Sequence, residues 1–482
     1  MLLEAEWVLP ISSAPIRDGA VWIDGAGIMD VGPADDLRQE HPAEEAKSFP
    51  GCVILPGLVN AHSHLEYSAF RDFARQSGFA EWMLRLLLAR RRLAAEDYGV
   101  SALWGARECV RGGVTYIGDA AFEGWTTIRA ANAAGLRARV YLEAFGIDDA
   151  KLPQTMDRLE ARLEVLRKEC GPLVELGLSP HAPYTVSARL YREVARFARR
   201  QDMRVATHVA ESQAEVDFLG AGAGPLANAY RAAKMWRGER WAPPGIRPVE
   251  YLESAHALGP ELLAVHCVQV SEADIALLGE RGVAVAHCPR SNLRLDCGVA
   301  PVAEFLAAGL KVGLGTDSAA SNDSLDMFAE MRAALTLSRA RAAEPAAAPG
   351  VLAAAAPPLT AGQALRLATL DGARALGVDR MVGSLEPGKA ADLIVVRLPR
   401  GHALARELAP AAPSAFACGD PSGLTPAADP VETLVTRAST SDVKLVLVAG
   451  RVVFDAAART READERIDRD FGAVRVKLGL SD

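Results

Sequence analysis

The sequence lacks the features that mark several common protein classes. Its seven cysteines include no Cys-x-x-Cys pair and are odd in number, which argues against a disulfide framework and favours a reducing compartment. No uninterrupted apolar run reaches about 18 residues, so no membrane span is expected. The N-terminus, MLLEAEWVLP, carries acidic residues early and does not show the basic start and long apolar stretch of a secretory signal. These absences predict a soluble, cytoplasmic protein.

Large basic blocks are also absent. The 482 residues carry a formal net charge of −8, which favours solubility and argues against a general nucleic-acid binder. The only basic cluster, ARRR at 89–92, lies within an amphipathic pattern and is predicted to be an exposed helix face. We therefore expect a small-molecule substrate as the partner, and neither nucleic acid nor a membrane.

Three segments of the chain differ in pattern. Residues 1–55 contain short strand-like runs punctuated by Gly and Pro, as in a small β-structure. Residues 56–377 alternate short apolar runs with helical stretches, and residues 378–482 return to a strand-like pattern. The two chain ends are therefore predicted to form one composite β-sandwich domain beside a central domain, with a helix at the C-terminus.

The end of the central segment has its own pattern. TAGQALRLATLDGARALG at 360–377 is predicted to be a pair of helices that stops at Gly377. The Ala/Pro-rich stretch 342–358 before it is predicted to be a loop or linker. The Ala-, Pro- and Gly-rich stretch 400–441 fits no element.

Eight apolar runs in the central segment are predicted to be strands. They lie at 58–62, 114–118, 137–146, 174–181, 204–209, 262–267, 283–288 and 311–317. Amphipathic helix patterns separate most of them, which indicates a parallel sheet, and eight is the number of strands that closes a barrel. The predicted fold is an α/β protein with a (β/α)8 TIM barrel, and a doubly wound open sheet is the competing architecture.

Histidines gather where these predicted strands end. His62 and His64 flank one residue at the end of the first strand, and alternate residues of a strand point to the same side. His208, His266 and Asp317 end the fifth, sixth and eighth strands. Active sites of such barrels lie at the C-terminal ends of the strands, so these side chains are expected to converge. The alternative is a set of hydrogen-bonded structural histidines.

Three histidines and one aspartate suit a single divalent cation. Zinc fits this donor set best, and iron or manganese is compatible with it. Such an ion would lower the pKa of a bound water toward about 7 and so supply hydroxide. Glu211 is expected to shuttle a proton to a leaving amine, unless it is only an N-cap or first-turn residue of the next helix. His266 is expected to polarise the attacked carbon or to steer the hydroxide, unless it is a supporting or core residue, and Asp317 is expected to act also as a base.

Longer motifs resemble a known family. PGLVNAHSHLE, THVAES, VHCV, HCPRSNLRL and LGTDSAASNDSLDMFAEMR together are similar to the amidohydrolase superfamily, in its branch of cytosine, guanine and adenosine-type deaminases and triazine hydrolases with one metal. The resemblance covers about nine-tenths of the chain. It implies that His62, His64, His208 and Asp317 are metal ligands and that Glu211 and His266 are catalytic. The fourth strand ends in LSPHAPYTVS without a Lys that could bridge two metals, which supports a single ion.

The resemblance also suggests which residues bind the substrate. HSHLEYSAF, GFAEWM, YLEAFG and PVEYLESAHALGP look most like aminodeoxyfutalosine deaminases of the alternative menaquinone route, with methylthioadenosine/adenosylhomocysteine deaminases as the near competitor and guanine deaminase and triazine chlorohydrolases further off. The residues implied to line the pocket are Glu66, Phe79, Trp82, His181, Ser291, Asn292 and Ser318. Phe79 and Trp82 are three apart on a predicted helix, so core packing is the alternative for them.

The function expected from these residues is hydrolytic deamination of a 6-aminopurine nucleoside-like compound. Hydrolysis of an amide, a ring C–N bond or a chloro-triazine by the same metal water is the enzymatic alternative. A non-catalytic binding protein on a decayed barrel is the alternative from a different class. A homodimer or larger homo-oligomer is expected because relatives in this branch commonly assemble in that way.

Overall fold

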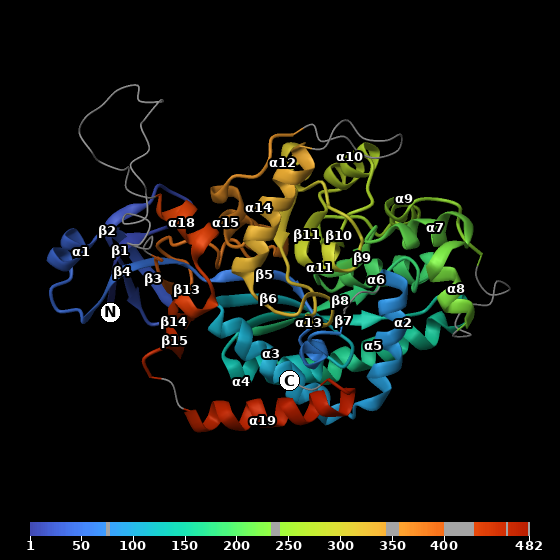
Figure 1. Cartoon of the computed structure of the whole chain (residues 1–482), viewed down its shortest axis with the longest axis horizontal. Helices are drawn as coiled ribbons and strands as arrows, with labels where there is room; N and C mark the ends of the chain where they lie inside the picture. The colour runs from blue at the N-terminus through green and yellow to red at the C-terminus, as the bar shows by residue number, and fades with distance from the viewer. Residues whose placement is uncertain (74–77, 233–241, 344–355, 400–428, 459–460, 481–482) are drawn as a thin grey trace, which may run out of the picture.

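The computed structural model describes residues 1–73, 78–232, 242–343, 356–399, 429–458 and 461–480. Their strands form an eight-stranded sheet, which occupies the middle of the molecule, and a seven-stranded sheet to one side of it (Figure 1). The predicted loop at 342–358 and the unassigned stretch at 400–441 fall largely outside the described residues. No described helix is long and apolar enough to cross a membrane.

The larger sheet contains all eight predicted strands in chain order, and every neighbouring pair is parallel. The strands are β5 (Leu58–Ser63), β6 (Val114–Ala121), β7 (Arg137–Ala144), β8 (Val174–Pro180), β9 (Val205–Val209), β10 (Leu262–His266), β11 (Ala284–His287) and β12 (Lys311–Leu314). A bridge between Ser63 and Asp317 joins the first strand to the chain just beyond the last. The sheet therefore closes, which confirms the TIM barrel.

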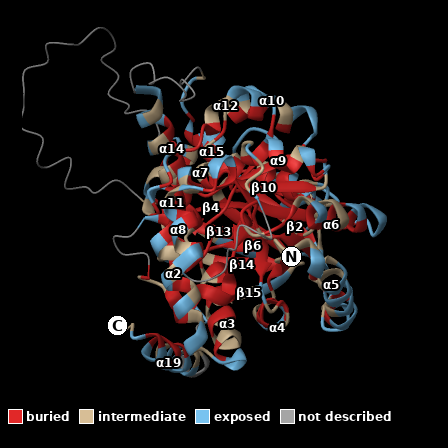
Figure 2. Cartoon of the chain, turned by 90° about the vertical axis from the view of Figure 1, so that its right-hand side faces the viewer, coloured by how far each residue is buried: buried red, intermediate tan, exposed pale blue. Residues whose placement is uncertain are grey.

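Helices connect successive strands on the outside of the barrel, and three more follow the last strand. The connecting helices are α3 (Ala95–Arg111), α4 (Trp125–Ala134), α5 (Leu152–Arg167), α6 (Ala188–Arg200), α9 (Pro248–Ser254), α10 (Glu272–Glu280) and α12 (Val302–Ala307), with a short 3-10 turn η3 (Asp149–Lys151) before α5; α14 (Met327–Ala343), α15 (Ala361–Leu367) and α16 (Leu370–Leu376) follow β12. Helix α6 shows the local cause: Ser187 caps its first turn by accepting the backbone N–H of Leu190, and its apolar face is buried. Figure 2 shows the buried strands surrounded by helices with exposed outer faces.

Further helices follow the C-terminal ends of the strands and cover that end of the barrel. They are η1 (Leu65–Phe70), α2 (Phe79–Ala89) and η2 (Arg90–Arg92) after β5, α7 (Gln213–Ala221) and α8 (Gly224–Ala232) after β9, α11 (Pro289–Arg294) after β11, and α13 (Ala319–Asn322) after β12. Helix α16 ends at Gly377, whose φ of +72° is the left-handed geometry that glycine adopts without strain, so the predicted helix pair is confirmed.

The smaller sheet is built from both ends of the chain, as predicted. It contains β1 (Leu2–Val8), β2 (Ile16–Asp24), β3 (Gly27–Pro33), β4 (Ala46–Pro56), β13 (Leu393–Arg397), β14 (Val443–Val448) and β15 (Arg451–Asp455), in the order β15-β14-β13-β4-β1-β2-β3, and α1 (Ala34–Glu40) packs on it. Its strands form one continuous sheet that curls until Gly27 pairs with Ala390. Ile28, Ile54 and Leu445 belong to the core of this curled sheet.

The C-terminal helix α19 (Arg461–Leu478) lies along α3, on the outside of the barrel (Figure 1). The rings of Trp104 and Phe471 stack at a centroid distance of 4.1 Å, and Asp464 pairs with Arg107 and Arg111. Helix α18 (Pro430–Arg437) and the turn η4 (Thr440–Asp442) precede β14. The domain limits 1–55, 56–377 and 378–482 stay predictions, although the passage from β4 to β5 and the end of α16 fall close to them.

Candidate metal and active site

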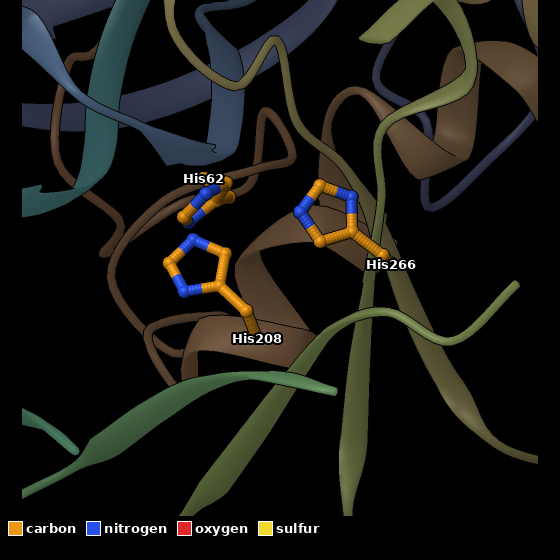
Figure 3. A group of neighbouring side chains, drawn as sticks. All are labelled: His62, His208 and His266. Carbon is orange, nitrogen blue, oxygen red and sulfur yellow. The ribbon is translucent and has the colours of Figure 1, made fainter. Parts of the chain in front are cut away.

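The imidazoles of β5, β9 and β10 converge at the C-terminal end of the barrel. Figure 3 shows the rings of His62, His208 and His266 pointing toward one another, with centroid distances of 4.9 Å from His62 to His208 and 5.5 Å from His208 to His266. His64 follows the last residue of β5, and its Nε2 lies 3.2 Å from Nε2 of His208. The structure therefore brings together the four histidines that the strand ends predicted.

Asp317 completes the group from the chain beyond β12. Its Oδ1 lies 3.6 Å from Nε2 of His62 and 3.6 Å from Nε2 of His64. Its backbone N–H donates to the carbonyl oxygen of His62 at 2.9 Å, across the seam that closes the barrel. Ligand atoms of His62, His64 and Asp317, and likewise those of His62, His208 and His266, lie within 4.8 Å of one another, which is the spacing that one shared cation requires.

A hydrogen bond fixes the direction in which the His208 ring offers its lone pair, and two further ring nitrogens face the site unpaired. Nδ1 of His208 lies 2.9 Å from the carbonyl oxygen of His181. Because a carbonyl only accepts, this Nδ1 carries the proton, and Nε2 faces the site with a lone pair. Nε2 of His62 and Nε2 of His266 are buried and have no hydrogen-bond partner among the described residues. Inward lone pairs without donors fit a cation between them.

The protonation states agree with that fit. Burial lowers the pKa of His64 to about 3 and that of His266 to about 4, and it holds the pKa of His208 well below its ordinary value. Burial alone would raise the pKa of Asp317, but its interactions with His62, His266 and His64 outweigh burial and hold the pKa well below its ordinary value. Neutral imidazoles and an ionised carboxylate are the forms that bind metals, so the set fits a divalent cation.

Asp317 is held by three donors. Its Oδ2 accepts the hydroxyls of Ser291 at 2.6 Å and Ser321 at 2.8 Å, and its Oδ1 accepts the backbone N–H of Ser318 at 2.7 Å. Ser318 lines the cavity described below, as expected of a substrate-binding residue, whereas Ser291 is not among the residues that line it. The structure thus gives Ser291 a part in orienting the carboxylate.

His266 and Asn292 form a similar pair. Nδ1 of His266 lies 2.8 Å from Oδ1 of Asn292, so the ring donates to the amide oxygen and turns Nε2 toward the site. The backbone of His266 has a φ of +74°, a geometry that a residue with a side chain rarely adopts, and it directs this ring inward. Asn292 does not line the cavity and acts through His266.

Glu211 faces the same group from the loop after β9. Its Oε1 lies 3.6 Å from Nε2 of His266, and burial together with the charges of Asp317 and Glu215 raises its pKa well above the ordinary value. Helix α7 begins at Gln213 with Ser212 as its cap, so Glu211 precedes the helix, and Glu215 is the acid of the first turn. The alternative for Glu211, a helix-capping role, therefore does not match its position.

A cavity of about 150 Å³ opens onto this group. The lining residues are His64, Tyr67, Phe79, Trp82, Met83, Leu86, Leu87, Arg90, Glu143, Phe145, His181, Tyr184, Thr185, His208, Glu211, Tyr230, His266, Asp317 and Ser318. Phe79 and Trp82 both line it and also pack in apolar clusters, so their positions are compatible with both predicted roles. Nδ1 of His181 lies 2.8 Å from the hydroxyl of Thr185, and its ring stacks on Phe145.

Glu66, predicted to be at the substrate mouth, is buried behind the cavity and is not among its lining residues. Its carboxylate accepts the backbone N–H groups of Phe122 at 2.9 Å and Gly124 at 3.1 Å, and also the hydroxyl of Thr126. These donors lie at the start of α4, where a helix leaves backbone N–H groups unpaired. In this structure Glu66 anchors the loop between β6 and α4.

The prediction of an exposed basic helix face at 89–92 was wrong for Arg90. Arg91 and Arg92 are exposed, but Arg90 lines the cavity, with its guanidinium 5.2 Å from the ring centre of Tyr67 and 4.5 Å from that of Phe122. Helix α2 ends at Ala89 and tightens into a 3-10 turn, which takes Arg90 off the helical pattern on which the prediction rested. Glu143, a lone acid near the end of a predicted barrel strand, also lines the cavity, although it was not among the predicted site residues.

A closed parallel barrel with histidines and an aspartate converging at its C-terminal end defines a metal-dependent barrel hydrolase. Residues 53–453 match the Amidohydrolase family, and the chain belongs to that family.

Named relatives match nearly the whole chain. A 5-methylthioadenosine/S-adenosylhomocysteine deaminase of Syntrophobacter fumaroxidans is 34% identical over 94% of this chain and 92% of its own length. A 5'-deoxyadenosine deaminase of Methanothermobacter thermautotrophicus is 33% identical over 92% of this chain and 91% of its own. The crystal structure of an adenosine deaminase from Xanthomonas campestris with bound zinc superposes with a TM-score of 0.80 at 28% identity, covering 99% of this chain and 98% of that one.

Proposed function

We propose that the protein is a metal-dependent deaminase that replaces the 6-amino group of an adenosine-type nucleoside by oxygen and releases ammonia. The observation that carries the proposal is the placement of the Glu211 carboxyl beside His266 and Asp317, at the inner end of the cavity. The names of the relatives support the same substrate class. In the reaction a water molecule adds to C6 of the purine, and the C6–N bond then breaks.

Each residue of the chain has a definite task in this reaction. A divalent cation held by His62, His64, His208 and Asp317 would lower the pKa of its water and so supply a nucleophile at neutral pH. Glu211, whose pKa is raised by burial, can hold a proton and deliver it to the leaving amine, which departs as ammonia only when protonated. Nε2 of His266 faces the same point and can steer the attacking oxygen.

We propose zinc as the native metal, with iron or manganese as the alternatives. The nitrogen-rich donor set supports zinc, and so does the zinc named with the similar Xanthomonas structure. Metal analysis of the purified protein tests this, and about one zinc per chain is the expected result. A protein with no bound ion and no affinity for added zinc would instead support the decayed-barrel alternative.

Ammonia release tests the substrate class. The zinc-loaded protein should deaminate at least one of adenosine, 5'-deoxyadenosine, methylthioadenosine, adenosylhomocysteine and aminodeoxyfutalosine, the last being the compound that the sequence resemblance favours. Turnover of none of these, or of only a guanine or a chloro-triazine, would overturn the proposal. The expected homodimer or larger assembly remains a prediction that light scattering of the same sample can check.

Glu211→Gln separates deamination from hydrolysis that needs no proton delivery. On the best substrate of the panel, kcat should fall by roughly 10²- to 10⁴-fold, the usual contribution of a positioned acid or base, while the metal content stays the same. Glu272→Gln, on the exposed face of α10, is the matched control and should keep full activity. Near wild-type activity of Glu211→Gln would show that proton delivery to an amine is not part of the reaction.

A further inference from the structure

The cavity wall contains a buried carboxyl that the deamination chemistry does not use. Glu143 lies near the C-terminal end of β7, is 4% exposed and lines the cavity. No described residue donates a hydrogen bond to its carboxyl, unlike Glu66 and Asp119 behind it, which each accept several. Burial raises the pKa of Glu143 to about 8. A buried carboxyl without donors that faces a cavity is poised to accept hydrogen bonds from a ligand.

Arg90 supplies the compensating charge on the same wall. Its guanidinium lies over the faces of Tyr67 and Phe122 and forms no ion pair with a described residue. Its positive charge lowers the pKa of Glu143 and so favours the ionised carboxylate. The arginine is therefore held by aromatic rings at a distance from which it stabilises Glu143 electrostatically and leaves the carboxylate oxygens accessible.

The balance of charge indicates which ligand group fits this wall. Arg90 compensates Glu143, and around this pair the acidic Glu66 and Asp119 are set against a second guanidinium, that of Arg162. A negatively charged substituent would thus meet no net positive charge, whereas a neutral group with two hydroxyl donors would satisfy both carboxylate oxygens. Two adjacent hydroxyls are what the ribose of a nucleoside presents.

We propose that Glu143 is the residue that binds the 2'- and 3'-hydroxyls of the substrate ribose, with Arg90 as the residue that positions it. This inference rests on the proposed nucleoside deamination and names the part of the substrate that is read. Phe79, Met83 and Leu86 form the apolar part of the wall, which suits the 5'-side of such a nucleoside.

The test compares 5'-deoxyadenosine with its analogue that lacks both ribose hydroxyls, 2',3',5'-trideoxyadenosine. Wild-type protein should prefer the diol in kcat/KM by roughly 10- to 100-fold, the range expected for hydrogen bonds to a charged group. In Glu143→Gln this preference should shrink toward one. Glu81→Gln, exposed on α2 and outside the cavity lining, is the matched control and should retain both the activity and the preference.

Arg90 variants test the positioning role. Arg90→Met should lose most of the preference for the diol and raise the pH at which that preference develops, because Glu143 then ionises less readily, and Arg90→Lys should restore part of both. A wild-type-like preference in Glu143→Gln would overturn the inference. So would an Arg90→Met defect confined to the carboxylate-bearing compounds of the panel, because Arg90 would then bind an anion. Failure of wild-type protein on every nucleoside would instead overturn the proposed function.

Discussion

The buried ion pair between Arg137 and Asp392 should contribute strongly to holding the barrel against the composite β-domain. Arg137 begins β7, and Asp392 directly precedes β13 of the smaller sheet. The guanidinium donates from Nε to Oδ2 at 2.7 Å and from Nη2 to Oδ1 at 3.1 Å. The aspartate side chain is fully buried and that of the arginine is 10% exposed, so this pair is shielded from solvent.

Replacing Arg137 by Met removes both hydrogen bonds and keeps most of the aliphatic volume. The Asp392 carboxylate then keeps one donor, the backbone N–H of Ala449 at 2.7 Å, inside a region where burial already raises its pKa. Leaving a buried charge without its partner costs about 3–5 kcal/mol of unfolding free energy. Protonation of Asp392 limits the loss, so about 3 kcal/mol is expected at neutral pH and less at pH 5.

Urea unfolding followed by tryptophan fluorescence and by circular dichroism measures this loss, and two probes are needed because a two-domain chain can unfold in steps. Arg281→Met is the control, because Arg281 makes an equally close pair with Glu253 on the surface, where solvent screens it. The double variant Arg137→Met/Asp392→Asn should be more stable than Arg137→Met alone. A loss in Arg137→Met no larger than that of the surface control would refute the reasoning.

Three further predictions concern the active site and its support. Removing the metal with a chelator should abolish deamination, and adding back zinc should restore it; activity that survives with no measurable metal would contradict the site assignment. Asn292→Ala should lower kcat/KM by roughly 10- to 100-fold with little change in metal content, because His266 loses the acceptor that orients it, and steady-state kinetics measure this. Burial raises the pKa of Glu330 to about 8, above its unfolded value of about 4.3, so the native state binds the extra proton and loses stability as pH rises between these values. The unfolding free energy of the wild type minus that of Glu330→Gln should therefore fall from pH 5 to pH 8, as urea unfolding at the two pH values measures. A difference that does not change with pH would contradict this.

The barrel and the histidines and aspartate that converge at its end were predictable because their signals are local. A strand buried on both faces is a short continuous apolar run, and all eight runs became strands. The polar residues His62, His208 and Asp317 interrupt the pattern at strand ends, where a parallel barrel gathers side chains from distant parts of the chain. The order of the strands in the barrel was therefore enough to predict that these three side chains converge.

The residues around the metal-facing group were less predictable because their roles depend on contacts between loops. Ser291 and Asn292 were expected to touch the substrate, but their hydrogen bonds run to Asp317 and His266. Glu66 was expected at the mouth, but its carboxylate pairs with backbone donors of a loop more than 50 residues away. Arg90 was wrongly predicted to lie on an exposed helix face. The chain passes from α2 into a 3-10 turn at this residue, and helical periodicity in the sequence does not reveal that change.

The contacts that close the barrel also place Asp317 beside the histidines. The seam between β5 and the chain after β12 is joined by Asn60, whose side chain donates to the Thr316 hydroxyl at 2.7 Å and accepts the Thr316 backbone N–H at 3.0 Å. The next residue along, Asp317, donates its backbone N–H to His62 across the same seam. Its carboxylate therefore reaches His62 and His64 only when the first and last strands are paired. A chain whose barrel failed to close would lose this carboxylate from the group and keep only histidines, so the proposed metal site depends directly on closure of the barrel.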